Sequence, residues 1–259
     1  MIKSLTKGLD APLVDAGFDP KSIADLVFWG EGDGPNILNG STVSRLADQS
    51  GNANHADQAV AINQPTFINS SSTFNNRPAI HFLGNDELRF SGAGLDMFRN
   101  TNGFTCFVVG KIDNFNALQF FLFASIATGL TTTRASMFPQ TNQVLWGGVR
   151  RLDTDNGVAG SGGSVNTTDA FLFELFMDFD ATTMELKKDG STIYQNTTFG
   201  TAGNSSDTPS MGIAIGSSNG TNYLNGLVSA VIIYKRALNS AERDYIRKGL
   251  GEKYGIPVI

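Results

Sequence analysis

The segment FLFELFMDFDATTMELKKDGSTIY, from Phe171 to Tyr194, decides the fold class. Along its first half, one face of the chain carries a large apolar residue at every second position: Phe171, Phe173, Leu175, Met177 and Phe179. A period of two with aromatic residues is typical of a strand whose one face packs in a core. Asp180–Thr183 then predicts a turn, and Asp189-Gly190 predicts a tight hairpin, because both of its central positions favour positive φ. Three antiparallel strands in succession predict an all-β protein.

Length and composition are consistent with one large β domain. The chain has 259 residues, of which 41% are hydrophobic and 19 are phenylalanine, enough to fill a wide core. The 29 glycines, beside only 17% charged residues, favour many turns between buried strands over disorder. No repeat or linker divides the strands, so we predict a single domain over residues 19–259. Residues 1–18 are weakly patterned and predict an N-terminal arm that docks the domain onto another protein.

Charge and cysteine content narrow the partners and the compartment. The net charge is −5 and no basic cluster exists, which argues against nucleic acid, since phosphate binding needs concentrated Lys and Arg. Cys106 is the only cysteine, so no internal disulfide can form, and its strand-like surroundings predict a buried thiol. The sequence shows no signal peptide and no apolar run long enough to span a bilayer. We therefore expect the chain to fold in a cytoplasm, without a membrane partner.

The rest of the chain predicts further strands, one long loop and one helix. The strands are expected at 26–29, 43–47, 77–83, 87–90, 104–112, 118–125, 135–138, 144–150, 211–215 and 227–234. Residues 153–169 are rich in Gly, Ser, Thr and Asn and predict a long loop. Asn239 and Glu242 predict the start of a C-terminal helix through a capping box, and Gly255 predicts its end. Its expected apolar stripe consists of Ala241, Tyr245, Ile246 and Leu250.

Four segments resemble a known group of domains. They are DPKSIADLVFW (19–29), LADQSGNANHA (46–56), RPAIHFLGNDEL (77–88) and LNGLVSAVIIYKRALNSAER (224–243). In this order they resemble the concanavalin A-like, laminin-G-like jelly-roll domains of bacteriophage structural proteins and bacterial surface proteins. The resemblance spans roughly residues 19 to 256 and implies a two-sheet antiparallel jelly-roll sandwich. It says little about the ligand, because this fold hosts lectins, glycosidases and interaction modules.

One branch of that fold cleaves β-glucans with two carboxylates on one strand, in a Glu-x-Asp-x-x-Glu pattern. Glu31-Gly-Asp33 begins in this way, but no second glutamate follows. Glu174 and Asp178 share a strand face, and we interpret them as solvated acids on the outer surface. With this motif broken, we predict that the protein is not an enzyme and has no catalytic residues.

Calcium is the metal that this fold most often carries, in loops that supply Asp, Asn and backbone oxygens. The candidate ligands in this sequence are Asp48, Asn52, Asp57, Asn85 and Asp86. Ordinary turn chemistry is the preferred interpretation of these residues, because Asp and Asn are frequent in turns without any metal. No other cofactor is expected.

Carbohydrate binding would use an exposed aromatic ring with polar neighbours. Two platforms are candidates: Trp146 with Arg150, and Tyr223 with Asn222 and Asn225. Trp29 is expected to pack in the core instead.

The resemblance, the absence of a signal peptide and the N-terminal arm together favour a non-enzymatic structural or adhesion module of a bacteriophage virion. Such a module would decorate the head or the tail, dock onto other virion proteins through the arm, and bind host or environmental glycans. It would be assembled in the host cytoplasm, and a homo-oligomer would be compatible with it. The alternatives are a lectin-like carbohydrate-binding surface protein and, less favoured, a β-glycan hydrolase.

Overall fold

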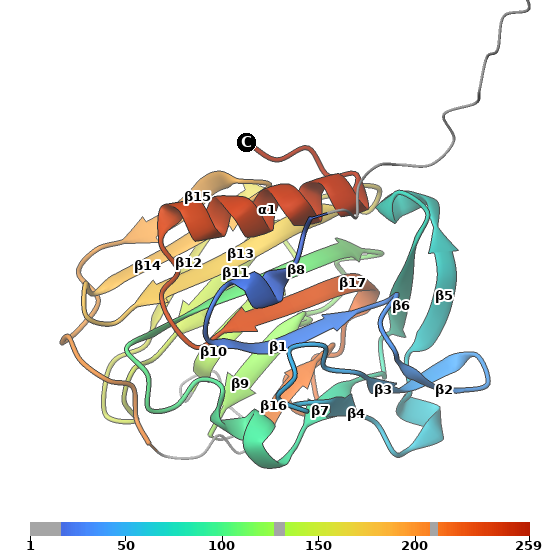
Figure 1. Ribbon diagram of the computed structural model, residues 1–259, viewed down its shortest axis with the longest axis horizontal. Helices are drawn as coiled ribbons and strands as arrows, with labels where there is room; N and C mark the ends of the chain where they lie inside the picture. The colour runs from blue at the N-terminus through green and yellow to red at the C-terminus, as the bar shows by residue number, and fades with distance from the viewer. Residues whose placement is uncertain (1–16, 127–132, 208–211) are drawn as a thin grey trace, which may run out of the picture.

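The computed structural model describes residues 17–126, 133–207 and 212–259 (Figure 1). In this part of the chain, seventeen strands belong to one antiparallel sheet, followed by one C-terminal α-helix, α1 (Ser240–Tyr254). The prediction of an all-β protein with a C-terminal helix is therefore confirmed. Residues 1–16 of the predicted arm lie outside the described residues. No described helix has the length and the apolar character that crossing a membrane would require.

The strands are β1 (Leu26–Glu31), β2 (Ile37–Asn39), β3 (Thr42–Leu46), β4 (Ala56–Asp57), β5 (Thr66–Ser71), β6 (Arg77–Leu83), β7 (Leu88–Phe90), β8 (Gly103–Ile112), β9 (Leu122–Ser125), β10 (Thr133–Pro139), β11 (Val144–Val149), β12 (Val158–Ser164), β13 (Phe171–Asp178), β14 (Thr183–Lys188), β15 (Ser191–Asn196), β16 (Gly212–Ile215) and β17 (Asn225–Tyr234). Short 3-10 turns occur at Pro20–Ser22, Ala61–Asn63, Ser72–Phe74 and Gly92–Asp96.

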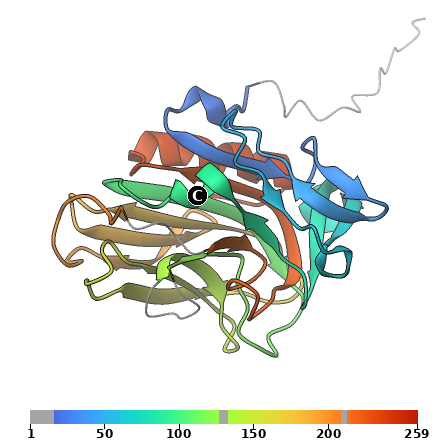
Figure 2. The same cartoon turned by 90° about the horizontal axis from the view of Figure 1, so that it is seen from below.

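The sheet curls back on itself, so that two walls face each other (Figure 2). The first wall has the order β1–β17–β8–β13–β14–β15. The second has the order β12–β11–β10–β9–β16–β7–β4–β3–β2. β6 pairs with β17 and with β5, and β5 reaches β3, which joins the walls. The result is a large, nearly barrel-shaped antiparallel sheet, and the finer division into two jelly-roll sheets stays a prediction.

A core of apolar side chains fills the space between the walls. β13 contributes the alternating residues predicted from the sequence, Phe171, Phe173, Leu175 and Met177, and Phe179 follows directly after the strand. The hairpin predicted at Asp189-Gly190 is also present, with φ of +52° and +86° at these two residues. Cys106 is fully buried in this core, and burial raises the pKa of its thiol. The predicted role of Cys106 as a small core residue is confirmed.

α1 covers the outer face of the first wall. The side chain of Asn239 accepts a hydrogen bond from the Glu242 amide, the Glu242 carboxylate accepts one from the Asn239 amide, and Gly255 ends the helix at φ +69°. These caps are the ones that the sequence predicts. Ile246 and Leu250 pack against the wall.

The charged residues under α1 correct two predictions. Ala241 and Tyr245 are exposed, because Arg243 and Arg247 occupy the buried side of the helix instead. Both arginines bond to Glu174 of β13, which is 1% exposed and lies beneath the helix. The interpretation of Glu174 as a solvated acid was wrong, because the sequence did not show which wall the helix would cover.

β12 lies inside the segment 153–169, which the sequence predicts as a loop, so that prediction is wrong for residues 158–164. Its glycines permit a close approach to β15, since a Cβ at Gly160 would lie 2.2 Å from the Tyr194 ring and one at Gly162 would lie 2.2 Å from the Ile193 carbonyl oxygen. A composition that is typical of loops here serves close packing between strands.

Candidate functional site

The two walls differ in what covers them. α1, the only α-helix among the described residues, lies on the first wall, and β10, β11 and β12 lie on the opposite side of the molecule (Figure 2). In these three strands, Met137, Leu145 and Val149 point into the core. Successive side chains in a strand point to opposite faces, so Phe138 and Trp146 point outward, and Arg150 continues this alternation directly after the end of β11.

The register of β10, β11 and β12 places the outward residues in three rows. Phe138, Trp146 and Ser161 form the first row, which we call the aromatic row. Ser136, Gly148 and Ala159 form the second row, which consists of small residues and which we call the middle row. The third row consists of Arg134 and Arg150, and we call it the arginine row. The Arg150 amide donates a hydrogen bond to the Arg134 carbonyl oxygen at 3.2 Å. One face of β11 thus presents an indole, then a glycine, then a guanidinium group.

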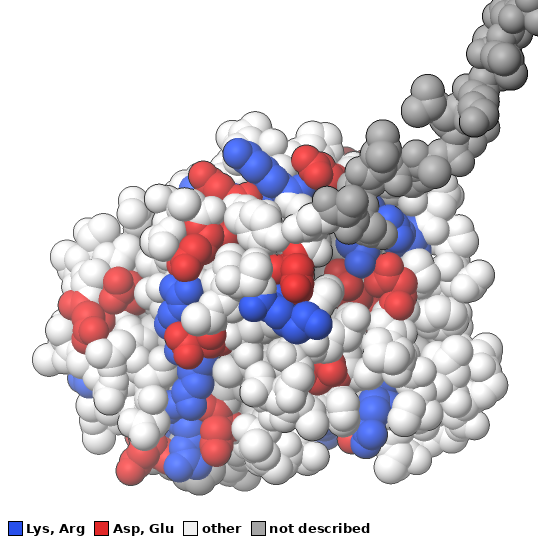
Figure 3. Space-filling view, in the orientation of Figure 1, with Lys and Arg blue, Asp and Glu red and all other residues white. Residues whose placement is uncertain are grey.

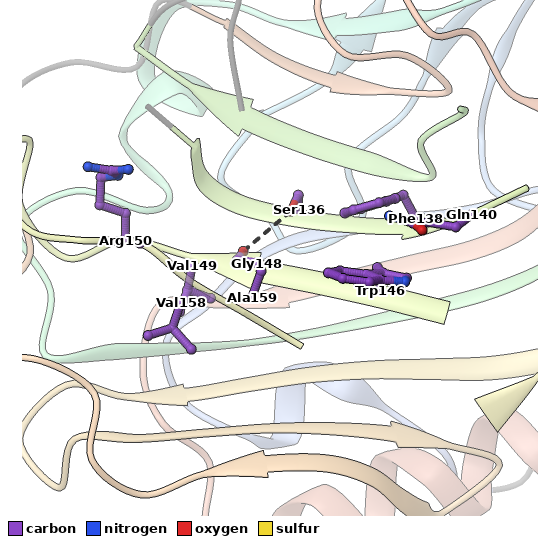
Figure 4. Close-up of a pocket in the computed structure, with 10 residues that line it drawn as sticks. Ser136, Phe138, Gln140, Trp146, Gly148, Val149, Arg150, Val158 and Ala159 are labelled. Carbon is purple, nitrogen blue, oxygen red and sulfur yellow. Dashed lines mark hydrogen bonds between the residues drawn. The ribbon is translucent and has the colours of Figure 1, made fainter. Parts of the chain in front are cut away.

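A recessed cavity of about 250 Å³ lies over these rows (Figure 4). Ser136, Phe138, Gln140, Trp146, Gly148 and Arg150 contribute to its lining, together with Val149 and residues 157–159. Trp146 and Arg150 lie toward opposite ends of the labelled group, with Gly148 between them (Figure 4). The cavity exists because the middle row lacks large side chains.

The aromatic end of the cavity is rigidly supported. The Trp146 ring stacks on Phe138 with centroids 6.2 Å apart and 26° between the ring planes, and Phe138 packs in turn on Phe120 at 4.6 Å. Trp146 itself is half-buried, and its Nε1–H is shielded from solvent without a hydrogen-bond partner among the described residues. A buried donor without an acceptor is uncommon in folded proteins.

The arginine end has one guanidinium group without a carboxylate partner. Arg134 is 1% exposed and pairs with Asp153, and Arg151 pairs with Asp155 at 3.1 Å. Arg150 donates from Nη1 to the backbone carbonyl of Asp155, and within the described residues its side chain contacts no carboxylate. Burial lowers the pKa of the Arg134 guanidinium, Asp153 opposes this, and the nearby charge of Arg150 lowers the pKa of Arg134 further.

One of the two predicted carbohydrate platforms lies at this cavity. Trp146 and Arg150 line the same cavity, as described above. Asn222 and Tyr223 lie in the loop before β17, where the Asn222 amide group donates to Ser218 Oγ at 2.9 Å, and Asn225 begins β17. The backbone amide of Asn225 donates to Gln119 Oε1 at 2.8 Å. These three residues do not line the cavity.

Several residues that line the cavity were not identified from the sequence. Ser136 and Phe138 alternate with core residues on β10 and could have been found from that period of two. Val158 and Ala159 lie on β12, which the sequence presents as a loop, and nothing in its composition indicates a binding site.

The five predicted calcium ligands do not converge on one site. The Asp48 carboxylate accepts hydrogen bonds from three backbone amides, those of Trp29, Ser50 and Asn54, and from the Ser50 hydroxyl. The Asn52 side chain donates to the Leu26 carbonyl oxygen at 2.8 Å.

The other three candidates lie elsewhere. Asp57 pairs with Arg45 at 2.6 Å, Asn85 donates to the Ile62 carbonyl oxygen, and Asp86 accepts from the Leu83 amide. Among the described residues, no group of three or more His, Cys, Asp or Glu side chains could hold a metal ion. These side chains are engaged in backbone hydrogen bonds and, for Asp57 of β4, in an ion pair with Arg45 on the neighbouring strand β3.

Glu31 and Asp33, the two acids of the incomplete Glu-x-Asp-x-x-Glu pattern, hold α1 in place. Glu31 is 2% exposed and accepts from Lys253 Nζ at 2.9 Å and from the Tyr254 hydroxyl at 3.0 Å. Lys253 Nζ also lies 3.2 Å from Asp33. Glu31 and Asp33 therefore anchor the end of the helix. On the face that includes α1, acidic and basic side chains alternate, and neither sign forms a broad patch (Figure 3).

The fold occurs in solved structures of carbohydrate-active proteins, although no family model and no curated protein sequence matches the chain. A Trypanosoma rangeli sialidase aligns with a TM-score of 0.61 at 17% identity, over 89% of this chain and 33% of the sialidase. The Ruminococcus gnavus IT-sialidase CBM40 bound to α2,3-sialyllactose aligns at 0.54 and 14% identity, over 66% of this chain and 96% of that one. Domain 4 of the Geobacillus stearothermophilus GH43 arabinanase AbnA, in complex with arabinotriose, aligns at 0.56 and 14% identity, over 85% and 98%.

These comparisons correct the prediction that the protein is not an enzyme, because the sialidases and the arabinanase that share its fold are enzymes. The Glu-x-Asp-x-x-Glu pattern is required only in one branch of one fold group, so its absence does not exclude other kinds of glycosidase. This chain spans about a third of the length of the sialidases that it matches. At such identities the likeness shows the fold alone, and the three structures described above give no support for a virion context.

Proposed function

We propose that the protein binds glycans in the cavity over β10, β11 and β12. The observation that carries this proposal is the half-buried Trp146, held by Phe138 at one end of a recess whose floor is made of small residues. Ligand pockets of this kind combine aromatic surface with a few polar groups that fix orientation, here from Gln140, Ser136 and Arg150. A tryptophan ring offers an apolar face for the C–H groups of a sugar and an N–H for a hydroxyl oxygen.

The coverage of the structural neighbours supports a binding module as the shared unit. Two of the aligned structures are covered almost completely, at 96% and 98%, and both are described as bound to an oligosaccharide. The sialidase is covered for only 33% of its length. We infer that the present chain corresponds to the glycan-binding part of such proteins.

The lining of the cavity favours binding over cleavage at this position. Glycosidases of the common type need two carboxylates beside the scissile bond. Among the described residues that line the cavity there is neither Asp nor Glu. A hydrolytic site of this two-carboxylate type would therefore lie elsewhere in the protein.

Two finer proposals rest on the sequence resemblance. We propose that the two walls correspond to the two sheets of a concanavalin A-like jelly roll, which the face-to-face packing around one core supports. We also propose, from the sequence resemblance, that the protein is a component of a bacteriophage virion and docks onto other virion proteins through residues 1–18. Mass spectrometry of purified bacteriophage particles tests the location, and its absence from all particle fractions would contradict it.

The two tryptophans of the chain allow a direct test of the site. A glycan array first identifies oligosaccharides that bind, and two variants, Trp29→Phe and Trp146→Phe, then each retain a single fluorescent indole. We expect a bound glycan to shift the emission of the Trp29→Phe variant, which keeps Trp146 in the cavity, and to leave the emission of the Trp146→Phe variant unchanged. No array signal above background, or a shift confined to the Trp146→Phe variant, would overturn the proposal.

A further inference from the structure

We infer that the ligand is an anionic oligosaccharide that lies along β11, with a sugar ring at Trp146 and its acidic group at Arg150. This inference rests on the proposed function and adds the chemical class and the direction of the ligand.

The three arginines at this end of the cavity differ in their partners. Arg134 and Arg151 have carboxylate partners in Asp153 and Asp155, whereas Arg150 reaches only a backbone carbonyl oxygen within the described residues. That bond uses one of the five N–H donors of the guanidinium group. Arg150 Nε is shielded from solvent and has no hydrogen-bond partner among the described residues. The cavity therefore ends at a positive charge with unused donors, in a protein whose net charge is −5.

A guanidinium group is well suited to an acidic sugar. Its planar donors match the two oxygens of a carboxylate or a sulfate, and such charge-assisted bonds are stronger than those to neutral hydroxyl groups. A neutral glycan would leave the charge of Arg150 partly desolvated without a counter-charge, which is unfavourable. The arginine end thus discriminates by charge.

The spacing of the two ends favours an oligosaccharide over a single sugar. Trp146 lies on β11 and Arg150 follows directly after this strand, so at about 3.3 Å per residue their Cα atoms are about 13 Å apart. This backbone span is longer than one sugar ring, which favours a ligand of two or more rings. Between them, Gly148, Ser136 and Ala159 leave room for the chain of the oligosaccharide.

The test uses oligosaccharides printed in matched acidic and neutral forms. The pairs are oligogalacturonates with their methyl esters, sialylated glycans with their asialo forms, and sulfated galactans with their desulfated forms. The best pair is then measured by calorimetry at low and at high salt with the unmodified protein and with two variants. Arg150→Gln removes the charge at the cavity but keeps an amide donor, and Lys248→Gln removes one charge from the exposed face of α1 as a matched control.

We expect the unmodified protein to prefer the acidic form by roughly 10- to 100-fold, the range for a charge-assisted bond. Arg150→Gln should abolish that preference while retaining affinity for the neutral form, Lys248→Gln should preserve it, and high salt should reduce it. The carboxylate and sulfate pairs show which acidic group is recognised. Binding of neutral forms alone, or a preference that survives Arg150→Gln, would overturn this inference and leave the proposed function standing. Binding of neither form of any pair would overturn this inference, and the broad glycan array would then decide the proposed function.

Discussion

Gly147 and Gly148 are neighbours in β11 that face opposite sides of the second wall. A methyl group at Gly147 therefore tests the packing of the core, and one at Gly148 tests the floor of the cavity. A Cβ at Gly147 would lie 2.4 Å from Cδ2 of Leu186, inside the core. Overpacking of this kind costs about 1–3 kcal/mol, which lowers Tm by about 2–12 °C in a chain of this size. The cavity is untouched, so Gly147→Ala should keep its glycan affinity.

The expected effects of Gly148→Ala are the reverse. A Cβ there would lie 2.9 Å from Ser136 Oγ, a hydroxyl that can rotate, and 3.6 Å or more from the next atoms. The free energy of unfolding should therefore change by less than about 1 kcal/mol. The new methyl group occupies the floor of the cavity, and the same overpacking then falls on the complex. We expect glycan affinity to fall by roughly 5- to 150-fold.

Thermal unfolding and calorimetry with a glycan chosen from the array measure both quantities on each variant. The crossed pattern is the decisive result, because a general loss of fold would lower stability and affinity together. If Gly148→Ala bound the glycan as tightly as the unmodified protein, the ligand would not lie over the middle row. Equal losses of stability in the two variants would refute the assignment of their opposite faces.

Three further predictions concern the scaffold. Glu174→Ala removes the carboxylate that pairs with Arg243 and Arg247, so urea unfolding should show a loss of about 3–5 kcal/mol, and a loss below about 1 kcal/mol would contradict the buried network. Asp48→Ala removes the acceptor of three backbone amides and should cost at least about 1.5–3 kcal/mol, while added calcium should leave the Tm of the unmodified protein unchanged. Burial alone would raise the pKa of Glu185, but hydrogen bonds from Thr192 and Arg243 hold this pKa below the ordinary value of 4.5. The ionised carboxylate therefore stabilises the fold above pH 4.5, and this stabilisation is lost as the pH falls below that value. Glu185→Gln should reduce the loss of unfolding free energy at acidic pH, measured by urea unfolding as a function of pH.

The parts of the fold that the sequence predicts are those in which the local pattern and the packing agree. The period of two in β13, the Asp-Gly turn and the capping box of α1 are all signals within a few residues, and each appears as expected. The prediction for β12 fails because its glycines are required by contacts with β15, where Ile193 lies 31 residues after Gly162. The prediction that Glu174 is solvated fails for a related reason, because the burial of Glu174 depends on which wall α1 covers.

The candidate site divides along the same line. Trp146 and Arg150 were identifiable because each carries recognisable chemistry, and their even spacing on one strand places them on one face. The cavity between them was not identifiable, because it is defined by side chains that are small or missing. Gly148 and Ala159 become a floor only when β11 and β12 pair in a particular register. For a glycan site of this kind, the sequence predicts the groups that contact the ligand, whereas the shape of the site follows only from the strand register. Variants of the middle row therefore test the site more sharply than removal of the tryptophan.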